Sequence, residues 1–396
     1  MGHRRRERPA LQRSQRRQRV KSDPSPRKKR HGLLESTAFR HHVSEVRRLS
    51  ILLFVVLCNA EFGCREKSVP PSVAFGADGR PLPPLQLEQP AKPVSQSETD
   101  TSLWRGYRIL EGSGRGRYNV ACYHARLGQS EAALYWLQRS AIEESADADY
   151  AALDSDLATL RTDPRWPGVF AFLKATQAWY RTHPLDRQLL SLPAHHQLGG
   201  SLPLVIGLHG LGSDPEDFAG AWDGLADELG VAFLSVSGTE TLGPQAYRWT
   251  EDVEADTARL ERAIAAVAPH VKAIDGQVFL IGFSQGAQMA VEIVAHRPSR
   301  FGGAIAMSPG LRGSLVPLAS PAADASKPRY VLVANEKEHP GTIRFLRQNE
   351  DQLKALGAQV HTHLYAGVAT HSFSPDFRDA LPRWLRFLAR GGPVDP

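Results

Sequence analysis

Residues 278–291 read VFLIGFSQGAQMAV. An apolar run typical of a buried β-strand ends in the pentapeptide GFSQG, and an apolar-faced helical pattern begins directly after it. A strand, a sharp turn and a helix in this order lift a serine, here Ser284, out of the sheet as a nucleophile. Because a turn this tight brings the helix and strand backbones together, a Cβ at Gly282 or Gly286 is expected to collide. Ser284 is then expected at a helix N-terminus, where free N–H groups favour negative charge.

The C-terminal half of the chain, residues 184–392, alternates between short apolar runs and helical patterns. The apolar runs expected as buried strands are 202–208, 231–236, 278–283, 303–307, 330–334 and 360–365. The stretches expected as helices lie near 216–229, 253–270, 285–296, 341–356 and 375–390. Alternation of this kind predicts a mostly parallel sheet with helices on both faces. Together with the serine turn it predicts an α/β-hydrolase fold.

Four stretches of this half resemble the phospholipase/carboxylesterase family of small α/β-hydrolases. They are LVIGLHGLGSD (204–214), YRWTED (247–252), IGFSQGAQMA (281–290) and GVATHSF (367–373). The family consists of serine esterases that act on carboxylic, acyl-thioester or lysophospholipid bonds without a cofactor. The resemblance therefore implies an ester hydrolase that needs no cofactor and takes a small-molecule ester as substrate.

The resemblance also assigns the groups that bind the oxyanion, namely the backbone N–H of Leu211 and that of Gln285. Such a donor stabilises a transition state by roughly 3 kcal/mol. Three neighbouring residues are candidates for substrate contact: His209, Gly210 and Trp249. A structural role is favoured for His209, which precedes the nucleophile and belongs to the loop. For Trp249, core packing is an equal alternative to lining a pocket.

The general base must follow Ser284, because hydrolases of this topology run in the order serine, acid, histidine. The histidines downstream of the serine are His296, His339, His361, His363 and His371. His371 follows the last expected strand in a loop that contains Gly367, so we expect it to be the base. His296 ends a helix, and His361 and His363 share one face of a strand, where histidines are more often structural.

The acid is where the chain departs from the family pattern. Relatives carry an aspartate after the strand that precedes the last one, whereas this chain reads NEKEH at residues 335–339. Aligning the strand ends makes Glu338 the first candidate and Glu336 the second. Asp376 follows His371 and is expected to cap the final helix. If no carboxylate reaches His371, the protein is expected to bind acyl groups without turning them over.

A second pattern, in residues 104–183, predicts a small all-α module. Residues 118–143 look like a tetratricopeptide unit of two antiparallel helices, and residues 149–173 resemble the form that closes such arrays. The functional interpretation is a groove for a protein or peptide partner. The alternative, slightly favoured, is a packed spacer that leans on the next domain.

The first hundred residues change character three times. Residues 1–48 carry 16 Lys/Arg and 4 Asp/Glu, against 32 and 38 in the remainder, so the positive charge lies in a polar tail that we expect to be disordered. Residues 49–64 are typical of an export signal whose apolar core is too short to span a bilayer. Cleavage after Ala60 and lipidation of Cys64 are the two alternatives, and a start near Val43 gives a signal of normal length. Residues 65–103 are Pro-rich and predict an extended spacer.

Several classes of function are disfavoured by composition. The basic residues are not interleaved with aromatic ones, so no nucleic-acid partner is expected. Three scattered cysteines predict neither a disulfide framework nor a metal site. The sequence therefore predicts a secreted, periplasmic or lipid-anchored serine esterase. The alternatives are a serine peptidase with the same triad and a peptide-binding adaptor with a degenerate hydrolase.

Overall fold

The computed structural model describes residues 73–250, 252–310 and 327–394. The basic tail, the export segment 49–64 and Cys64 lie outside the described residues, so these parts of the prediction stay predictions. Within the described ranges, every helix is too short or too polar to cross a membrane.

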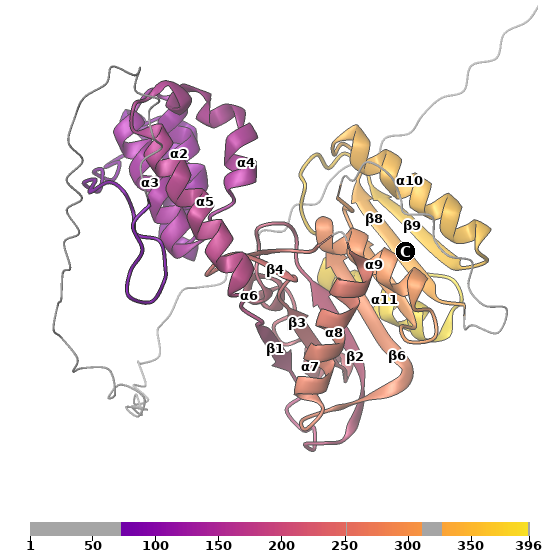
Figure 1. The fold of residues 1–396 in the computed structure, drawn as a ribbon. Helices are drawn as coiled ribbons and strands as arrows, with labels where there is room; N and C mark the ends of the chain where they lie inside the picture. Colours follow the sequence, from indigo (N-terminus) through magenta and orange to yellow (C-terminus); the bar gives the residue numbers. More distant parts are fainter. Residues whose placement is uncertain (1–72, 251, 311–326, 395–396) are drawn as a thin grey trace, which may run out of the picture. The chain divides into compact units, whose positions relative to one another are not determined.

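Residues 101–182, which we call the helical part, form five α-helices and a 3-10 segment around one apolar core (Figure 1). The elements are α1 (Thr101–Ser113), α2 (Arg117–Arg126), α3 (Ser130–Glu143), α4 (Ala148–Leu153), η2 (Ser155–Thr162) and α5 (Trp166–Thr182). The buried small residues Ala121, Ala125 and Ala133 let α2 and α3 approach closely. Gly128, at φ 73°, turns the chain between these two helices. A helical pair thus occupies the predicted residues, while the tetratricopeptide likeness itself stays a prediction.

The described part of the Pro-rich segment, from residue 73 onward, lies against the helical part. A short 3-10 turn, η1 (Gln96–Glu98), precedes α1, and the chain before it lies against the helical part. The backbone of Leu85 exchanges two hydrogen bonds with the Gln138 side chain, at 3.3 and 3.2 Å. Arg80 donates to the Tyr180 hydroxyl at 2.8 Å. The few apolar residues between the prolines, Leu85 and Leu87, pack on the helical core and hold the segment there.

The C-terminal half forms a seven-stranded sheet in the order β1-β3-β2-β6-β7-β8-β9. The strands are β1 (Gln188–Ser191), β2 (Ser201–Leu208), β3 (Ala232–Val236), β6 (Lys272–Phe283), β7 (Gly303–Met307), β8 (Arg329–Asn335) and β9 (Gln359–Tyr365). Only β1 is antiparallel to its neighbour in this sheet, and the other pairs are parallel. The predicted α/β-hydrolase fold with a mostly parallel sheet is confirmed. Parallel pairing gathers the carboxyl ends of the strands at one edge, where functional loops of such folds lie.

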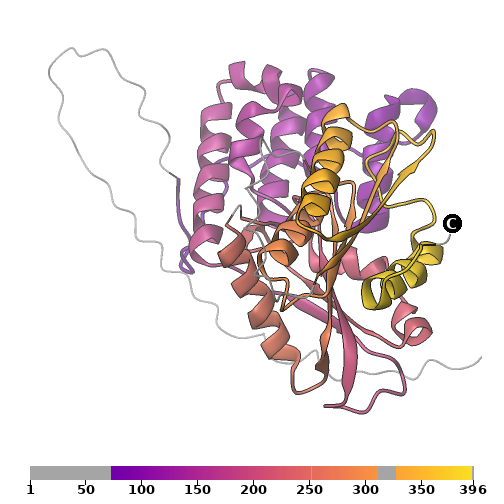
Figure 2. The same ribbon diagram turned by 90° about the vertical axis from the view of Figure 1, so that its right-hand side faces the viewer.

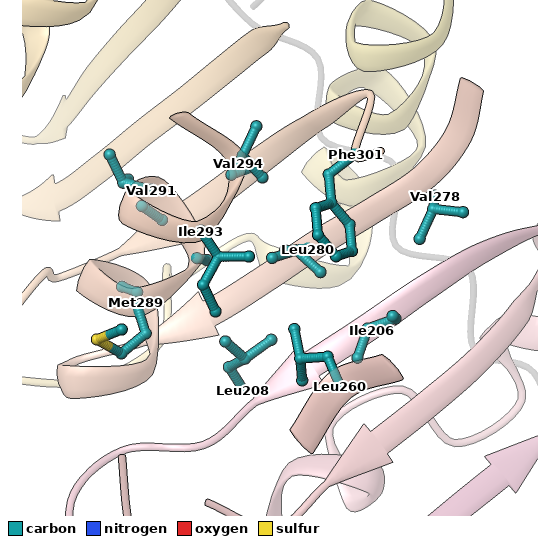
Figure 3. Packing of buried hydrophobic residues seen from close by; sticks show 14 of the residues in the cluster. Ile206, Leu208, Leu260, Val278, Leu280, Met289, Val291, Ile293, Val294 and Phe301 are labelled. Atoms are coloured by element: carbon teal, nitrogen blue, oxygen red, sulfur yellow. The ribbon is translucent and has the colours of Figure 1, made fainter. Parts of the chain in front are cut away.

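Helices cover both faces of this sheet (Figure 2). Side chains alternate along β2, so Leu204, Ile206 and Leu208 enter one core and Val205 enters the other. The first core also takes α8 (Val253–Val267), α9 (Gln285–His296) and α10 (Pro340–Ala355), and Figure 3 shows part of this packing. The second takes α6 (Pro215–Gly220), α7 (Leu225–Leu229) and α11 (Phe377–Arg390). The central strands of the sheet are therefore buried on both faces, which explains their nearly continuous apolar residues.

Two features of this half differ from the sequence prediction. The stretch expected as one helix over 216–229 is two short helices, because Gly224 at φ 79° interrupts it. The edge strand β1 and a separate hairpin, β4 (Glu240–Gly243) with β5 (Ala246–Arg248), were not predicted. These three strands are only three or four residues long and contain polar residues, so they carry no apolar run.

Candidate functional site

Ser284 occupies the sharp turn between β6 and α9. Its backbone has φ 55° and ψ −119°, a conformation that residues with a Cβ rarely adopt. Its N–H donates to Met307 O at 3.0 Å, which fixes the turn to the next strand. A Cβ added at Gly282 would lie 2.2 Å from Gly286 O, and one at Gly286 would lie 2.1 Å from Leu208 O. The predicted collisions at both glycines are confirmed, and they explain why the turn needs residues without side chains.

His371 lies beside this serine. The loop after β9 carries it, and its Nε2 is 2.9 Å from Ser284 Oγ. Its Nδ1 is 3.1 Å from Glu338 Oε1. The imidazole is 48% exposed, whereas the Glu338 side chain is 1% exposed. With the proton on Nδ1, the ring donates to a buried carboxylate and offers Nε2 as an acceptor to an accessible hydroxyl.

Of the two candidate acids, the structure brings Glu338 and not Glu336 to the histidine. Glu338 follows a turn in which its N–H donates to Asn335 O at 3.1 Å, and its Oε2 accepts from the Asn335 N–H at 3.4 Å. Glu336 is exposed, and its Oε2 accepts from the Gly367 N–H at 2.8 Å. Glu336 therefore links the start of the loop that carries His371 to the end of β8, and the structure gives it no contact with the His371 ring.

Further contacts fix the loop that presents His371. The Asn335 amide donates to Thr370 O at 2.7 Å, and the Lys337 N–H donates to Val368 O at 2.9 Å. The ring of Phe283, the residue before the serine, lies 4.9 Å from the imidazole centroid. The ring is thus held from both sides, which limits its rotation relative to Ser284.

The other downstream histidines have structural positions. His296 bonds to Glu292 O at the end of α9, and His339 accepts from the Gly341 N–H at the start of α10. His361 and His363 lie on β9, where each makes an edge contact with an aromatic ring, that of Phe387 and that of Tyr365.

The two N–H groups expected to bind an oxyanion are free among the described residues. Neither Leu211 nor Gln285 donates its backbone N–H to a described group, and Gln285 is the first residue of α9, where such groups are unpaired in the helix. Leu211 is 52% exposed. A Cβ built on Gly210 would lie 3.3 Å from Ser284 Cβ, so the loop that carries Leu211 adjoins the serine. A side chain at Gly210 would fit there only if its neighbours moved by a few tenths of an ångström.

The side chains of His209 and Trp249 lie beneath this loop and are shielded from solvent. His209 is fully buried, accepts from the Gly238 N–H at 2.8 Å and pairs with Gly210 O at 2.7 Å. Burial lowers the pKa of His209 to about 4, so the ring is neutral at neutral pH. The Trp249 indole is equally buried and donates to His209 O at 2.9 Å. Both side chains therefore support the loop from within the core, which agrees with the structural role favoured for His209 and with the core-packing alternative for Trp249.

Gln285 links this support to the helix that follows the serine. Its side-chain oxygen accepts from the Trp249 N–H and its amide donates to Trp249 O, each at 3.0 Å. The residue expected to bind an oxyanion through its backbone thus also anchors the segment that carries Trp249.

Asp376 occupies the N-cap position of α11, but the expectation that its side chain caps the helix is wrong. No cap hydrogen bond forms there. One carboxylate oxygen accepts instead from the Tyr365 hydroxyl, and the other lies 3.4 Å from Arg383 Nη2. A charged partner two turns along the helix competes with the free N–H groups of the first turn.

Sequence reasoning missed two charged residues near the site. Asp256 is fully buried in α8 and accepts from the hydroxyls of Thr239 and Thr250, the latter at 3.0 Å and one residue after Trp249. Arg115 of the helical part contacts the loop after β2. In the sequence both look like ordinary surface charges, and no local signal distinguishes them. Among the described residues, no group of three or more His, Cys, Asp or Glu side chains is placed to hold a metal ion.

Comparison with known proteins gives one family match and several similar solved structures. Residues 205–396 match the sequence model of the alpha/beta hydrolase family. A carboxylesterase of Bacillus cereus is 17% identical, with a TM-score of 0.42 over 54% of this chain and 99% of that one. A phospholipase/carboxylesterase of Dyadobacter fermentans is 20% identical, with a TM-score of 0.38 over 51% and 96%. Esterase PE8 is 23% identical, with a TM-score of 0.37 over 51% and 99%. No curated protein sequence gives a significant match.

Proposed function

We propose that the protein is a serine hydrolase that cleaves carboxylic esters through an acyl-enzyme. One observation carries the proposal. His371 Nε2 lies 2.9 Å from the Ser284 hydroxyl, while Nδ1 of the same ring lies 3.1 Å from the buried carboxylate of Glu338. A hydroxyl, an imidazole and a carboxylate in this order form the arrangement that activates a serine for attack on a carbonyl.

In the first half of the proposed reaction, Ser284 Oγ attacks the ester carbonyl carbon as His371 Nε2 takes the hydroxyl proton. Glu338 keeps the proton of the ring on Nδ1 and stabilises the imidazolium that forms. The tetrahedral oxyanion accepts from the N–H groups of Leu211 and Gln285, and the position of Gln285 at the N-terminus of α9 adds the favourable field of that helix end. Collapse expels the alcohol, which takes its proton from His371.

In the second half, water replaces the alcohol. His371 Nε2 takes a proton from water as its oxygen attacks the acyl carbon, and the carboxylic acid leaves when the proton returns to Ser284. The imidazole can serve both halves because it is half exposed and accessible to water, while the acid that orients it is not.

The ester as substrate class rests on the family resemblance of the motifs around Ser284 and His371. The same triad chemistry also cleaves amides, so a panel of short p-nitrophenyl esters, acyl thioesters and p-nitroanilide peptides tests this part separately. Hydrolysis of the peptides in preference to the esters would reject the ester class and keep the serine mechanism.

The serine itself is tested with Ser284→Ala. Hydrolysis of a short p-nitrophenyl ester and labelling by a fluorophosphonate should both disappear in this variant. Ser201→Ala is the matched control, because Ser201 is exposed and begins β2, where it pairs with Lys272 at the end of β6 that lies away from Ser284. Labelling retained in Ser284→Ala, or lost equally in the control, would reject the assignment.

We infer two further properties from sequence alone. Residues 49–64 support export, with the folded part secreted, periplasmic or lipid-anchored through Cys64. The tetratricopeptide-like pattern of residues 118–143 supports a protein or peptide partner for the helical part. Globomycin-sensitive processing with radiolabelled fatty acid tests the first, and pull-down with the helical part in the full chain tests the second.

A further inference from the structure

Arg115 reaches out of the helical part into the loop that follows β2. It lies in the turn between α1 and α2, and its guanidinium pairs with two carboxylates, Asp214 and Asp217, the latter at 2.7 Å. It also donates to Gln245 O at 3.4 Å. A planar guanidinium can hold all three oxygens at once through donors on separate nitrogens, whereas the three donors of an ammonium share a single nitrogen.

Asp214 is the more significant of its partners. Its side chain is 2% exposed, and it ends the segment HGLGSD three residues after Leu211. It also begins α6, where it accepts from the Asp217 N–H at 2.9 Å. A carboxylate this deeply buried needs a charged partner, and among the described residues that partner is Arg115.

The other side of the same loop rests on the β4–β5 hairpin. Gly212 donates to Tyr247 O at 2.9 Å, and Tyr247 donates to Ser213 O at 3.0 Å. The two residues after Leu211, Gly212 and Ser213, are thus paired with β5, and the next residue, Asp214, is paired with Arg115. These contacts set the position of the Leu211 N–H.

The hairpin in turn touches the helical part. Ala146 donates to Leu242 O at 2.8 Å, and Gln245 donates to Glu144 O at 3.2 Å. At Gly243 the two chain segments approach so closely that an added Cβ would lie 2.3 Å from Glu144 O. The residues after α3 therefore support the hairpin that supports the loop.

Glu144 joins these two supports. Its carboxylate accepts from the N–H groups of Gly116 and Arg117, each at 2.9 Å, and so fixes the turn that presents Arg115. One residue of the helical part thus holds both the hairpin, through its carbonyl, and the arginine turn, through its side chain.

From this arrangement we propose that Arg115 is a positioning residue for catalysis, and that the helical part clamps the loop whose Leu211 N–H binds the oxyanion. This inference rests on the proposed function. Arg115 touches neither substrate nor Ser284; it acts through Asp214 on the orientation of the loop. Because an oxyanion donor acts mainly in the transition state, its misplacement lowers kcat more than it raises KM.

The test uses the full chain and a short p-nitrophenyl ester. Arg115→Ala should lower kcat by about 10- to 100-fold, with KM changed by less than about threefold, as expected for a donor displaced by a fraction of an ångström. Arg115→Lys should recover part of this loss, since lysine keeps the positive charge but lacks the planar array of donors of the guanidinium. Arg165→Ala is the matched control: Arg165 also pairs with carboxylates, Asp163 and Glu131, and both belong to the helical part. It should keep the wild-type kcat.

A purely structural role gives a different result. The double variant Arg115→Ala/Asp214→Asn removes the buried charge that Arg115→Ala leaves unpaired, so it should regain folding stability, measured by thermal melting, while kcat stays low. Recovery of kcat together with stability would overturn the inference, as would an Arg115→Ala enzyme with wild-type kcat. If Arg115→Ala does not fold, the lysine and double variants decide between the same outcomes. Absence of Ser284-dependent hydrolysis in the wild-type chain would instead reject the proposed function.

Discussion

Replacing Glu338 by Gln tests the least conventional part of the candidate site, a glutamate where the resembled family has an aspartate. The carboxylate accepts on both oxygens, from His371 Nδ1 at 3.1 Å and from the Asn335 N–H at 3.4 Å. An amide of the same shape has a single acceptor oxygen, so its NH₂ group must face one of the two donors. It also removes the negative charge that stabilises the imidazolium.

The expected effect is large. Loss of the acid of a Ser-His-acid triad with its geometry kept lowers kcat by about 10³- to 10⁴-fold, or roughly 4 to 5.5 kcal/mol of activation free energy. Glu336→Gln provides the matched comparison two residues away. It weakens one exposed hydrogen bond, to the Gly367 N–H, worth about 1 kcal/mol, so its kcat should fall by no more than about fivefold.

The assay is steady-state hydrolysis of a short p-nitrophenyl ester, with circular dichroism to verify that both variants are folded. A Glu338→Gln enzyme within tenfold of the wild type, beside an inactive Ser284→Ala variant, would refute the role of Glu338. An equal loss in Glu336→Gln would show that the loop and not the acid governs the rate.

Three further predictions concern stability. Ser284→Gly should unfold at a higher temperature than Ser284→Ala, because glycine relieves a backbone at φ 55° whose strain is about 1–3 kcal/mol; equal melting temperatures would contradict this. Gly286→Ala should abolish soluble expression, since its Cβ would lie 2.1 Å from Leu208 O, whereas Gly220→Ala, with nothing within 4 Å, should express normally. Burial raises the pKa of Asp256 to about 7, above the ~3.9 of an unfolded chain, so its contribution to stability is complete below about pH 4 and is lost as the pH rises to 7. The free energy of unfolding of the wild type, measured by urea denaturation relative to that of Asp256→Asn, should therefore fall by about 2–3 kcal/mol between pH 5 and pH 7. If the unfolding free energies of the two proteins change in parallel with pH, Asp256 is ionised at both pH values.

Much of the sheet and the turn at Ser284 follows from local sequence. Strands buried on both faces are apolar throughout, so β7 was predicted to the residue and β8 to within one. The bounds of β9 were also predicted to within one residue, but β9 is an edge strand without a fully buried residue and not the buried strand that we expected. Gly282 could be interpreted from local sequence, because the backbone that excludes its Cβ is that of Gly286, four residues further on. The Cβ of Gly286 is instead excluded by Leu208 O, in the distant strand β2. Chain order left five candidate histidines, and the position of His371 in a loop after the last expected strand selected it; the structure places it beside Ser284.

What the sequence did not reveal depends on distant partners. Trp249 looks the same in sequence whether it lines a pocket or packs below His209, and only the fold decides. The attraction of Asp376 to Tyr365 and Arg383 outweighs its local preference to cap α11. Arg115 and Asp214 are about a hundred positions apart, and nothing in either neighbourhood indicates the other.

The close approach at Gly243 limits how this chain can be divided or recombined. This glycine belongs to the hydrolase half, yet the backbone that forbids a side chain there is Glu144 O, in the helical part. In a hydrolase core joined to a different N-terminal domain, no backbone would exclude a side chain at Gly243. The buried Asp214 would also lack its ion pair with Arg115. The two halves of the described chain have thus been fitted to each other at single residues, and we expect them to be inherited together as one unit.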